Sequence, residues 1–336
     1  MSNVYVGVDL HKQSLVYVML SPDGHQLSSG QCGLDAGSLA DFMSRLTNRH
    51  HVVLEPLTNS FWFIEHVRQT GAMVHLANSR GVRLIAESRC KTDRIDARIL
   101  ADLLRIGYLP EVYQPSGRCL SWRHVVAEHR ALMSDQVRCC CRVRMLLSRE
   151  GVRLSASDCF SKKGRAEMAA ATLSPQTRRQ LNRLIKLYDT LDEDRIEVDK
   201  QIERASASDR IASLLMTIDG IGSLTALALR AHIDDIRRFG SPKALAAYSG
   251  LTPSLRQSAE TVHYGHITRQ GPSVLRWLLI QAVPHAVRKT PSLRRLYSRL
   301  CHRNSVGAAK VAVAHALIRI AWHVWKEARP YYRVAR

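Results

Sequence analysis

Acidic residues are scarce in this sequence: 29 Asp and Glu stand against 49 Lys and Arg, for a formal net charge of +20. So large a positive excess predicts a polyanionic partner, most simply nucleic acid. The excess is uneven, because residues 1–112 hold 11 basic and 11 acidic residues, whereas residues 272–336 hold 13 basic residues and one acid. The 336 residues are enough for two or three domains with separate cores. A catalytic domain joined to basic, nucleic-acid-binding parts fits this distribution.

Regular cysteine spacing, a leader segment and long apolar runs are also missing. None of the eight cysteines forms a C-x-x-C pair, and the consecutive run 139–141 suits neither a metal knuckle nor ordinary disulfides. Reduced, mostly buried thiols are therefore expected, as in a cytosolic protein. The first residues show no basic segment followed by an apolar one, so no signal peptide is predicted. The most apolar late stretch, 308–325, contains charged residues and is too polar to span a membrane.

Two carboxylates stand out in the stretch KTDRIDARIL, residues 91–100. Isoleucine and leucine recur there at helical spacing, so Asp93 and Asp96 are expected on one face of a helix, one turn apart. Like charges so placed repel unless a cation lies between them, and hard oxygen ligands favour Mg²⁺ or Mn²⁺. The alternative is a solvated acidic edge that pairs with the neighbouring Lys and Arg side chains.

Two further acids lie at the ends of expected strands. Asp9 is near the end of the apolar run VYVGVDL, and Glu55 follows the short run HVVL. Residues 4–20 predict a β-hairpin, followed by strands at 26–34, 51–54 and 73–76 and helices at 38–46, 61–69 and from 79 onward. This order is that of RNase H-like nucleases. Four carboxylates from different elements can hold two metal ions about 3.5–4 Å apart for phosphoryl transfer.

The middle of the chain is expected to be helical. Residues 118–150 predict one long helix that ends at Gly151, and residues 152–176 resemble a loop. From Leu181 to Ile202, apolar residues alternate at spacings of three and four with one interruption, which predicts a coiled coil or a helical hairpin. Pairing with another subunit and folding back on the preceding helix both remain open.

The last third contains a glycine turn and a polar stretch. Gly220 and Gly222 flank one isoleucine between two short apolar helices, which is the helix-hairpin-helix pattern and predicts phosphate contact; an ordinary helix turn is the alternative. Residues 254–270 are expected to form a polar loop, followed by a basic helix at 272–283. Ser254, Ser258 and Thr261 are hydroxyl candidates in that loop, and spacing alone makes none of them a nucleophile.

Several motifs together are similar to those of a known family. They are VGVDLHK around Asp9, VVLEP around Glu55, KTDRIDARIL, IDGIGSLTA, YSGLTPSLRQS and GHITRQGPSVLR. They follow one another in the family's order over nearly the whole chain. The chain thus resembles the DEDD transposases of the insertion-sequence one-ten family, which also includes the Piv/MooV DNA invertases.

The resemblance implies three parts: a RuvC-like α/β domain of RNase H fold at 1–115, a helical linker and coiled coil at 116–210, and a mainly α C-terminal transposase domain with the helix-hairpin-helix at 211–336. It assigns a Mg²⁺ or Mn²⁺ tetrad to the four acids, Asp9, Glu55, Asp93 and Asp96. It also implies a serine nucleophile five residues after Pro253, at Ser258. Gln257 and Ala259 depart from the family's usual residues beside it, so Ser254 is the second candidate.

The implied activity is DNA transposition or recombination. Serine attack on a phosphodiester stores the bond energy in a phosphoserine link, and metal held by the acids would activate the hydroxyl. Arg269 and Arg276 are candidates for contacts with the flanking phosphates. The implied partners are donor and target DNA, a noncoding bridge RNA, and further copies of the chain in a homodimer or homotetramer, without a membrane, in a bacterial cytoplasm with the nucleoid.

Two other functions also fit parts of the sequence. A RuvC-type nuclease or Holliday-junction resolvase would hydrolyse DNA with metal alone, which explains the acids and leaves the GLTP segment without a role. A non-enzymatic nucleic-acid-binding protein would explain the charge and leave the four acids unexplained. A covalent protein–DNA adduct would distinguish the recombinase from both.

Overall fold

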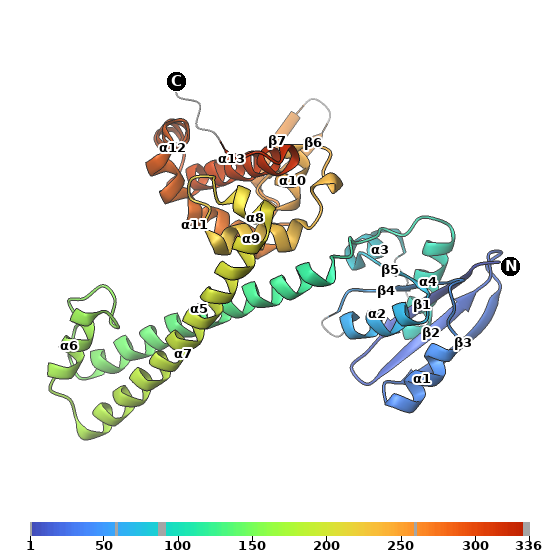
Figure 1. Ribbon diagram of the computed structural model, residues 1–336, viewed down its shortest axis with the longest axis horizontal. Helices are drawn as coiled ribbons and strands as arrows, with labels where there is room; N and C mark the ends of the chain where they lie inside the picture. Colours follow the sequence, from blue (N-terminus) through green and yellow to red (C-terminus); the bar gives the residue numbers. More distant parts are fainter. Residues whose placement is uncertain (1, 58–59, 87–91, 259–260, 332–336) are drawn as a thin grey trace. The chain divides into compact units, whose positions relative to one another are not determined.

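The computed structural model describes residues 2–57, 60–86, 92–258 and 261–331. The chain divides into two compact units, Met1–Gln114 and Pro115–Arg336, and each is described here by itself (Figure 1). The expected division at residue 210 falls inside the second unit.

Unit 1 is built on a mixed five-stranded sheet. Its strands lie in the order β3 (Gln26–Gly33), β2 (Ser14–Leu20), β1 (Val4–Leu10), β4 (His50–Leu54) and β5 (Met73–Leu76). The first three strands are antiparallel neighbours, while β4 runs parallel to β1 and β5 parallel to β4. The connecting helices are α1 (Ala36–Ser44), α2 (Ser60–Gln69), α3 (Ser79–Ile85) and α4 (Asp93–Arg105). This is the RNase H-like α/β arrangement that the order of elements predicts.

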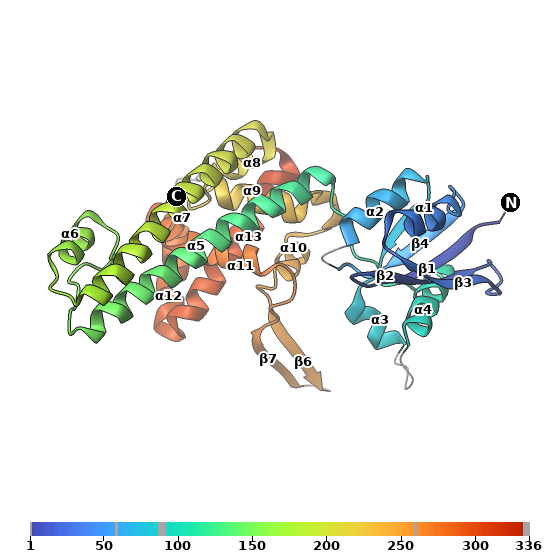
Figure 2. The same cartoon turned by 90° about the horizontal axis from the view of Figure 1, so that it is seen from below.

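The two faces of the sheet carry different cores. Because side chains alternate along a strand, Val6 and Val8 of β1 point to the face covered by α1 and α2, where Phe42 and Phe63 are buried with them. Gly7 points to the opposite face, which α4 covers (Figure 2). Asp9 follows Gly7 on that second face, so the helix with the paired acids and the strand with the first acid meet there.

Small residues let α4 approach β1 closely. A Cβ at Gly7 would lie only 1.8 Å from the carbonyl oxygen of Ala97, a backbone atom. Ala97 and Ala101 of α4 are fully buried on this contact. Gly7 therefore fixes how near the first turn of α4 comes to Asp9.

Unit 2 begins with two long helices that pack along each other. These are α5 (Gly117–Arg149) and α7 (Pro175–Ser208), and the apolar seam of α7 turns toward α5 within the same chain. Leu181 and Leu184 are buried with Cys139, Val143 and Leu147 of α5. Of the two arrangements left open by the heptad pattern, the structure contains the fold-back.

The segment between these helices is not the loop expected for residues 152–176, because it contains α6 (Lys162–Ala170). Ser161 caps this helix by accepting a hydrogen bond from the amide of Gly164. A Cβ at Gly164 would lie 2.4 Å from the carbonyl oxygen of Cys159, so glycine allows the helix to pack on the preceding turn. Gly164, a residue type that is unfavourable inside a helix, is thus a packing residue here.

The rest of unit 2 is a helical core with one β-hairpin. The helices are α8 (Arg210–Leu215), α9 (Ser223–Ile233), the 3₁₀ turn η1 (Ile236–Arg238), α10 (Pro242–Tyr248), α11 (Ser273–Lys289), α12 (Pro291–Arg303) and α13 (Val306–Glu327). Leu227, Leu279 and Leu317 are fully buried at its centre. None of the helices in the described ranges is both long and apolar enough to cross a membrane.

Helix α11 continues past Val283, where the sequence predicted its end. Pro284 lies inside the helix and is exposed to solvent. Proline removes one backbone donor and usually ends or kinks a helix. Here the buried face, with Leu279 and Ala286 in the core on either side of the proline, carries the helix on to Lys289.

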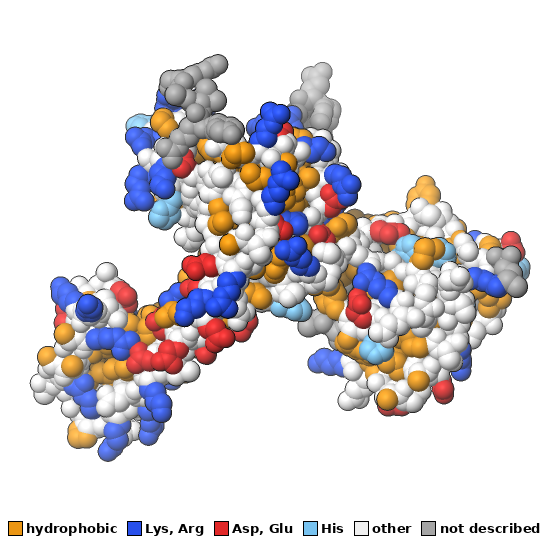
Figure 3. Space-filling view, in the orientation of Figure 1, with side chains coloured by type: hydrophobic (Ala, Val, Ile, Leu, Met, Phe, Trp, Pro, Cys, Tyr) orange, Lys and Arg blue, Asp and Glu red, His pale blue; other side chains and the backbone are white. Residues whose placement is uncertain are grey.

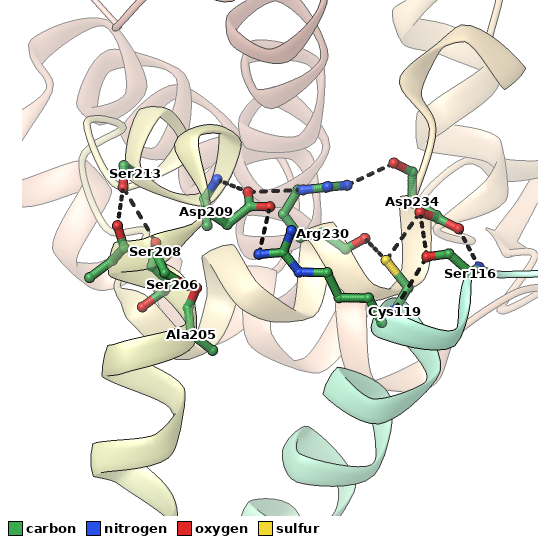
Figure 4. A network of polar contacts seen from close by, with 12 residues as sticks. Ser116, Cys119, Ala205, Ser206, Ser208, Asp209, Ser213, Arg230 and Asp234 are labelled. Carbon is green, nitrogen blue, oxygen red and sulfur yellow. Dashed lines mark hydrogen bonds and ion pairs between the residues drawn. The ribbon is translucent and has the colours of Figure 1, made fainter.

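A buried polar network joins the start of α5 to α8 and α9 (Figure 4). Arg230 donates to Asp209 Oδ1 at 3.0 Å, and the two side chains are 15% and 6% exposed. Arg230 also donates to the carbonyl of Asp234, whose carboxylate accepts from the amide of Ser116 at 2.7 Å. Cys119 adds a contact to Asp234. The network fixes the first turn of α5, just after the boundary between the units.

The polar stretch expected as a loop at 254–270 is mostly an antiparallel hairpin, β6 (Pro253–Ser258) and β7 (Thr261–Ile267). It extends away from the helices of unit 2 (Figure 2). Leu255 is 55% exposed, so the sequence has no buried apolar residue at this position to indicate a strand. This is a correction to the predicted loop.

Candidate metal centre

Two parallel strands bring the first pair of acids to one edge of the sheet. Asp9 lies at the end of β1, and Glu55 directly follows β4. Val8 and Leu54 are paired in register, so the residues after them leave the sheet side by side. Carboxyl ends of neighbouring parallel strands are a common place for sites in α/β folds.

Helix α4 supplies the second pair of acids. Its N-cap is Thr92, whose hydroxyl accepts from the amide of Ile95 at 3.3 Å. Asp93 and Asp96 lie in its first turn, where carboxylates are also favoured by the helix dipole. The structure thus places both acids in a helix, as the spacing predicted; Lys91, at the start of that motif, lies outside the described residues.

All four acids line one cavity of about 440 Å³. Its lining also includes His11 and Arg83, together with apolar side chains of α3 and α4. Every lining residue belongs to unit 1. The Asp93 side chain is 58% exposed, as in the solvated acidic edge considered for this pair, and both residues also line the cavity together with Asp9 and Glu55.

His11 is a site residue that sequence reasoning missed. Its Nε2 lies 3.4 Å from Asp9 Oδ2 and 3.1 Å from Asp93 Oδ2, so the imidazole bridges acids of two elements. One ligand atom from each of the three residues lies within 4.8 Å of the others. The only signal in the sequence is its place in VGVDLHK, just past the strand end.

The environment opposes negative charge at Asp9. Burial raises the pKa of this carboxyl, nearby His11 lowers it, and the charges of Asp93, Asp96 and Glu55 raise it further. A bound cation would relieve this repulsion. The donors are mainly carboxylate oxygens with one imidazole, a set that suits Mg²⁺ or Mn²⁺.

The candidate serines lie on the other unit. Ser258 ends β6, and its backbone is paired with Thr261; its side chain and Ala259 lie outside what the structure describes. The hydroxyl of Ser254 lies across the hairpin, where a Cβ on Gly265 would be 2.5 Å from its Oγ. That hydroxyl therefore lies over the β7 backbone.

Arg276 has a structural role that the sequence did not reveal. Its Nη1 donates to the carbonyls of Ser249, Gln270 and Gly271 at 3.2, 3.1 and 3.2 Å, at the base of the β6–β7 hairpin. Burial and the nearby charge of Arg269 lower its pKa. Arg269 is exposed, in a left-handed conformation with φ of 54°. Arg269 is thus accessible, whereas Arg276 is largely used inside the protein.

The two glycines of the expected helix-hairpin-helix differ. They lie between α8 and α9, as predicted. Gly220 has φ of 89°, and a Cβ there would lie 2.6 Å from the carbonyl oxygen of Ala282 on α11, so it is a packing glycine. Gly222 is exposed and is the N-cap of α9. A phosphate contact is sterically open only to Gly222 of these two.

Two family models match the chain. Residues 6–150 match a DEDD family of the IS110 type described as "Transposase", and residues 212–298 match the "Transposase IS116/IS110/IS902 family". The first match contains all four acids and His11, and the second contains the β6–β7 hairpin with Ser258. The matches therefore coincide with the two candidate sites.

Two transposases are similar to the chain over most of their length, and a gene-inverting protein is similar over a shorter part. A transposase for insertion sequence element IS1328 from Yersinia enterocolitica is 25% identical over 81% of this chain and 83% of its own. A probable family 20 transposase from Pseudomonas aeruginosa is 25% identical over 94% of this chain and 95% of its own. A pilin gene-inverting protein from Moraxella bovis is 32% identical over 36% of this chain and 38% of its own.

Proposed function

We propose that this chain, which belongs to the IS110/IS116/IS902 family of DEDD transposases, cuts and rejoins donor and target DNA through a serine–phosphodiester intermediate. The observation that carries the proposal is the convergence of Asp9, Glu55, Asp93 and Asp96 on one cavity, in a chain that also bears the β6–β7 hairpin, whose first strand ends at Ser258. The first feature suits metal-assisted phosphoryl transfer, and the second supplies the nucleophile.

The acids would hold one or two divalent ions, Mg²⁺ or Mn²⁺. Bound there, an ion would neutralise charge on the phosphate and lower the pKa of an oxygen bound to it. Asp9 and Asp93 already have oxygens close to a common point, marked by Nε2 of His11. Glu55 and Asp96 complete the lining, and the raised pKa of Asp9 supports a site that functions with a cation present.

The serine step conserves the energy of the phosphodiester bond that it breaks. The hydroxyl oxygen of Ser258 forms a bond to phosphorus, the bond from phosphorus to the leaving nucleotide oxygen breaks, and the proton of the serine passes to that oxygen. The reverse attack by a nucleotide hydroxyl on the phosphoserine reseals a strand. This cycle explains how strands could be exchanged without an external energy source.

The proposed partners follow from the same family. A noncoding bridge RNA would choose the donor and target sites, and exposed basic residues after position 112 that are not paired with an acid would bind both nucleic acids. A homodimer or homotetramer would bring two DNA segments together. Gly222 and Arg269 are the exposed members of the residues proposed to contact phosphates.

The alternative is hydrolysis by the acids alone, as in a RuvC-type nuclease or junction resolvase. The same convergence of carboxylates favours it, and it would not require the hairpin. The two activities differ in one product, since only the recombinase passes through a protein–DNA adduct.

The test uses purified protein, a labelled donor–target substrate, the RNA encoded beside the gene and Mg²⁺, with products resolved on a denaturing protein gel. Wild type is expected to form an adduct. Ser258→Ala and Asp93→Asn should each abolish it while DNA binding is retained. Asp102→Asn is the matched control on α4, because Asp102 pairs with Arg105 at 3.0 Å and does not line the cavity.

Each result of the adduct assay that differs from these expectations has a specific meaning. An adduct that survives in Ser258→Ala and is lost in Ser254→Ala would move the nucleophile to Ser254. Magnesium-dependent nicking by wild type without any adduct would replace the recombinase with the nuclease. Retention of all activity in Asp93→Asn would remove the acid cluster from the mechanism.

A further inference from the structure

Helix α12 carries a straight row of arginines. Arg295, Arg299 and Arg303 are four residues apart, so they lie along one side of the helix at intervals of about 6 Å. All three are exposed. The opposite side, with Leu293 fully inside the core, packs on α11 and α13. The helix is therefore held by its apolar side while the row faces solvent.

This row is distinct from the neighbouring arginine on the same helix. Arg294 turns back, and its Nε donates to the carbonyl of Val287 at 3.2 Å, with a second hydrogen bond to the carbonyl of Arg288. No ion pair involves Arg295, Arg299 or Arg303 anywhere in the described part of the chain. Their guanidinium groups are thus available to a partner.

The surrounding elements add positive charge rather than neutralise it. Helix α11 contributes Arg288 and Lys289 at the end nearest α12, and α13 carries three Lys and Arg. Glu327, the one acid of residues 272–336, contacts His323 at 3.4 Å, and the buried Asp219 accepts a hydrogen bond from Thr290 at the start of α12 at 2.7 Å. Lys and Arg side chains gather where α12 lies, in the upper left of Figure 3. Such a concentration of like charge lowers stability unless a polyanion binds to it.

We propose that the row of Arg295, Arg299 and Arg303 binds the sugar–phosphate backbone of duplex DNA. Guanidinium groups suit phosphate oxygens, and a regular row on a rigid helix suits a regular row of phosphates. Contacts of this kind carry no sequence information and position the duplex. The inference rests on the proposed action on DNA, and it assigns one helix of unit 2 to holding the DNA, separate from the acids and the serine hairpin.

The test measures the affinity of the full chain for a duplex of unrelated sequence as a function of salt, by fluorescence anisotropy. The triple variant Arg295→Gln, Arg299→Gln, Arg303→Gln is expected to lower the slope of log K against log[salt] by about 2–3, since each phosphate contact on duplex DNA contributes about 0.9. Affinity should fall by about 10- to 100-fold at low salt. Glutamine keeps the helix, because its helix propensity is high.

The matched control removes the same charge elsewhere. Arg68, Arg138 and Arg237 are exposed and each is paired with an acid, at 2.7, 2.8 and 3.0 Å. The corresponding triple glutamine variant should change the slope by less than about 1. If the row variant unfolds by circular dichroism, Arg299→Gln alone is measured, with an expected decrease in slope of about 0.9.

Equal slopes for the row variant and the control would overturn the inference. So would a loss confined to structured RNA with duplex DNA binding unchanged, because the row would then serve a different nucleic acid. The adduct assay on wild type remains a separate readout, so a failure of the proposed recombinase is distinguishable from a failure of the arginine row.

Discussion

At the scale of single residues, Gly7 limits the geometry of the acid cavity. It has no catalytic group, and it decides how closely α4 lies on β1 because a Cβ there would overlap the carbonyl of Ala97. Asp93 and Asp96 move with α4. Their distance from Asp9 is therefore set by a residue without a side chain.

Gly7→Ala is expected to push α4 away from the sheet. Overpacking against backbone atoms typically costs about 1–3 kcal/mol, and the 1.8 Å approach puts this variant at the upper end of that range. Urea unfolding measures the stability, and titration with Mn²⁺ followed by electron paramagnetic resonance measures the site. We expect a lower unfolding midpoint and weaker Mn²⁺ binding.

Gly37→Ala is the matched control in unit 1. A Cβ there would lie 3.6 Å from Asp35 Oδ1, which is ordinary contact, and the position lies inside α1. Stability should stay the same or rise by a few tenths of a kcal/mol, with unchanged Mn²⁺ binding. Equal effects of the two substitutions would refute the role assigned to Gly7.

At the scale of elements, the heptad seam of α7 packs against α5 of the same chain. Leu184→Asp would bury a charge in the cluster around Cys139 and Val143, and a loss of more than about 4 kcal/mol is expected. Leu187→Asp is the control, since Leu187 is 43% exposed. Thermal unfolding followed by circular dichroism should show a much larger loss of stability for Leu184→Asp than for Leu187→Asp.

The same two variants can also be compared by light scattering, which measures the mass of any assembly. If the exposed side of α7 joins two copies, Leu187→Asp should lower the mass of the assembly without unfolding the hairpin. If Leu184→Asp left the thermal unfolding temperature unchanged and only dissociated an oligomer, the packing of Leu184 against α5 of the same chain would be wrong.

The β6–β7 hairpin depends on its base. A two-stranded ribbon has little stability of its own, and Arg276 joins three carbonyls where the strands leave the helices. Arg276→Gln should speed amide hydrogen exchange in 253–258 and 261–267 by about tenfold or more, because each lost bond costs about 1 kcal/mol. Arg130→Gln, which loses one long bond to Ser273, should leave exchange in the hairpin unchanged.

The elements show which physical signals a sequence carries. Strands β1 and β2 were predictable because they are rich in Val and Leu, as expected for strands of a sheet that is buried on both faces. The hairpin was not, because it extends away from the helices of unit 2 (Figure 2) and Leu255, an apolar residue of β6, is 55% exposed. Helix α6 and the end of α11 were missed for a related reason: Gly164 and Pro284 are poor local choices that tertiary packing makes acceptable.

The candidate site was only partly predictable. Asp9, Glu55, Asp93 and Asp96 could be found because an acid at a strand end or a repeated acid on a helix is unusual. His11 could not, since its bridge between two acids exists only after α4 has packed on β1. Contacts between distant elements carry no local signature.

At the scale of the whole molecule, charge and core are divided between the units. Unit 1 has its own apolar clusters and equal numbers of acidic and basic residues, whereas the positive excess lies entirely in unit 2. The fragment 1–114 is expected to fold and to bind duplex DNA weakly, with a shallow dependence on salt. The full chain should bind far more tightly, with a steep dependence.

Anisotropy titrations of both proteins at matched salt, after circular dichroism has confirmed that the fragment is folded, provide the comparison. Equal affinities would mean that the neutral unit supplies most of the binding. The source of affinity would then have to be sought around the acid cavity instead of on the basic helices.

The two ends of the α5–α7 hairpin also belong to different apolar clusters. Cys139 and Leu184 lie in one, and Val126 and Ile202 in the other. Between them the helices meet through polar pairs such as Gln136 with Asp192 and His129 with Asp199, both at 3.0 Å. Because the two apolar clusters share no residue, we expect the tip to be a separate foldon that can melt before its base. A calorimetric trace of this protein should therefore contain overlapping transitions, with a van't Hoff enthalpy below the calorimetric one.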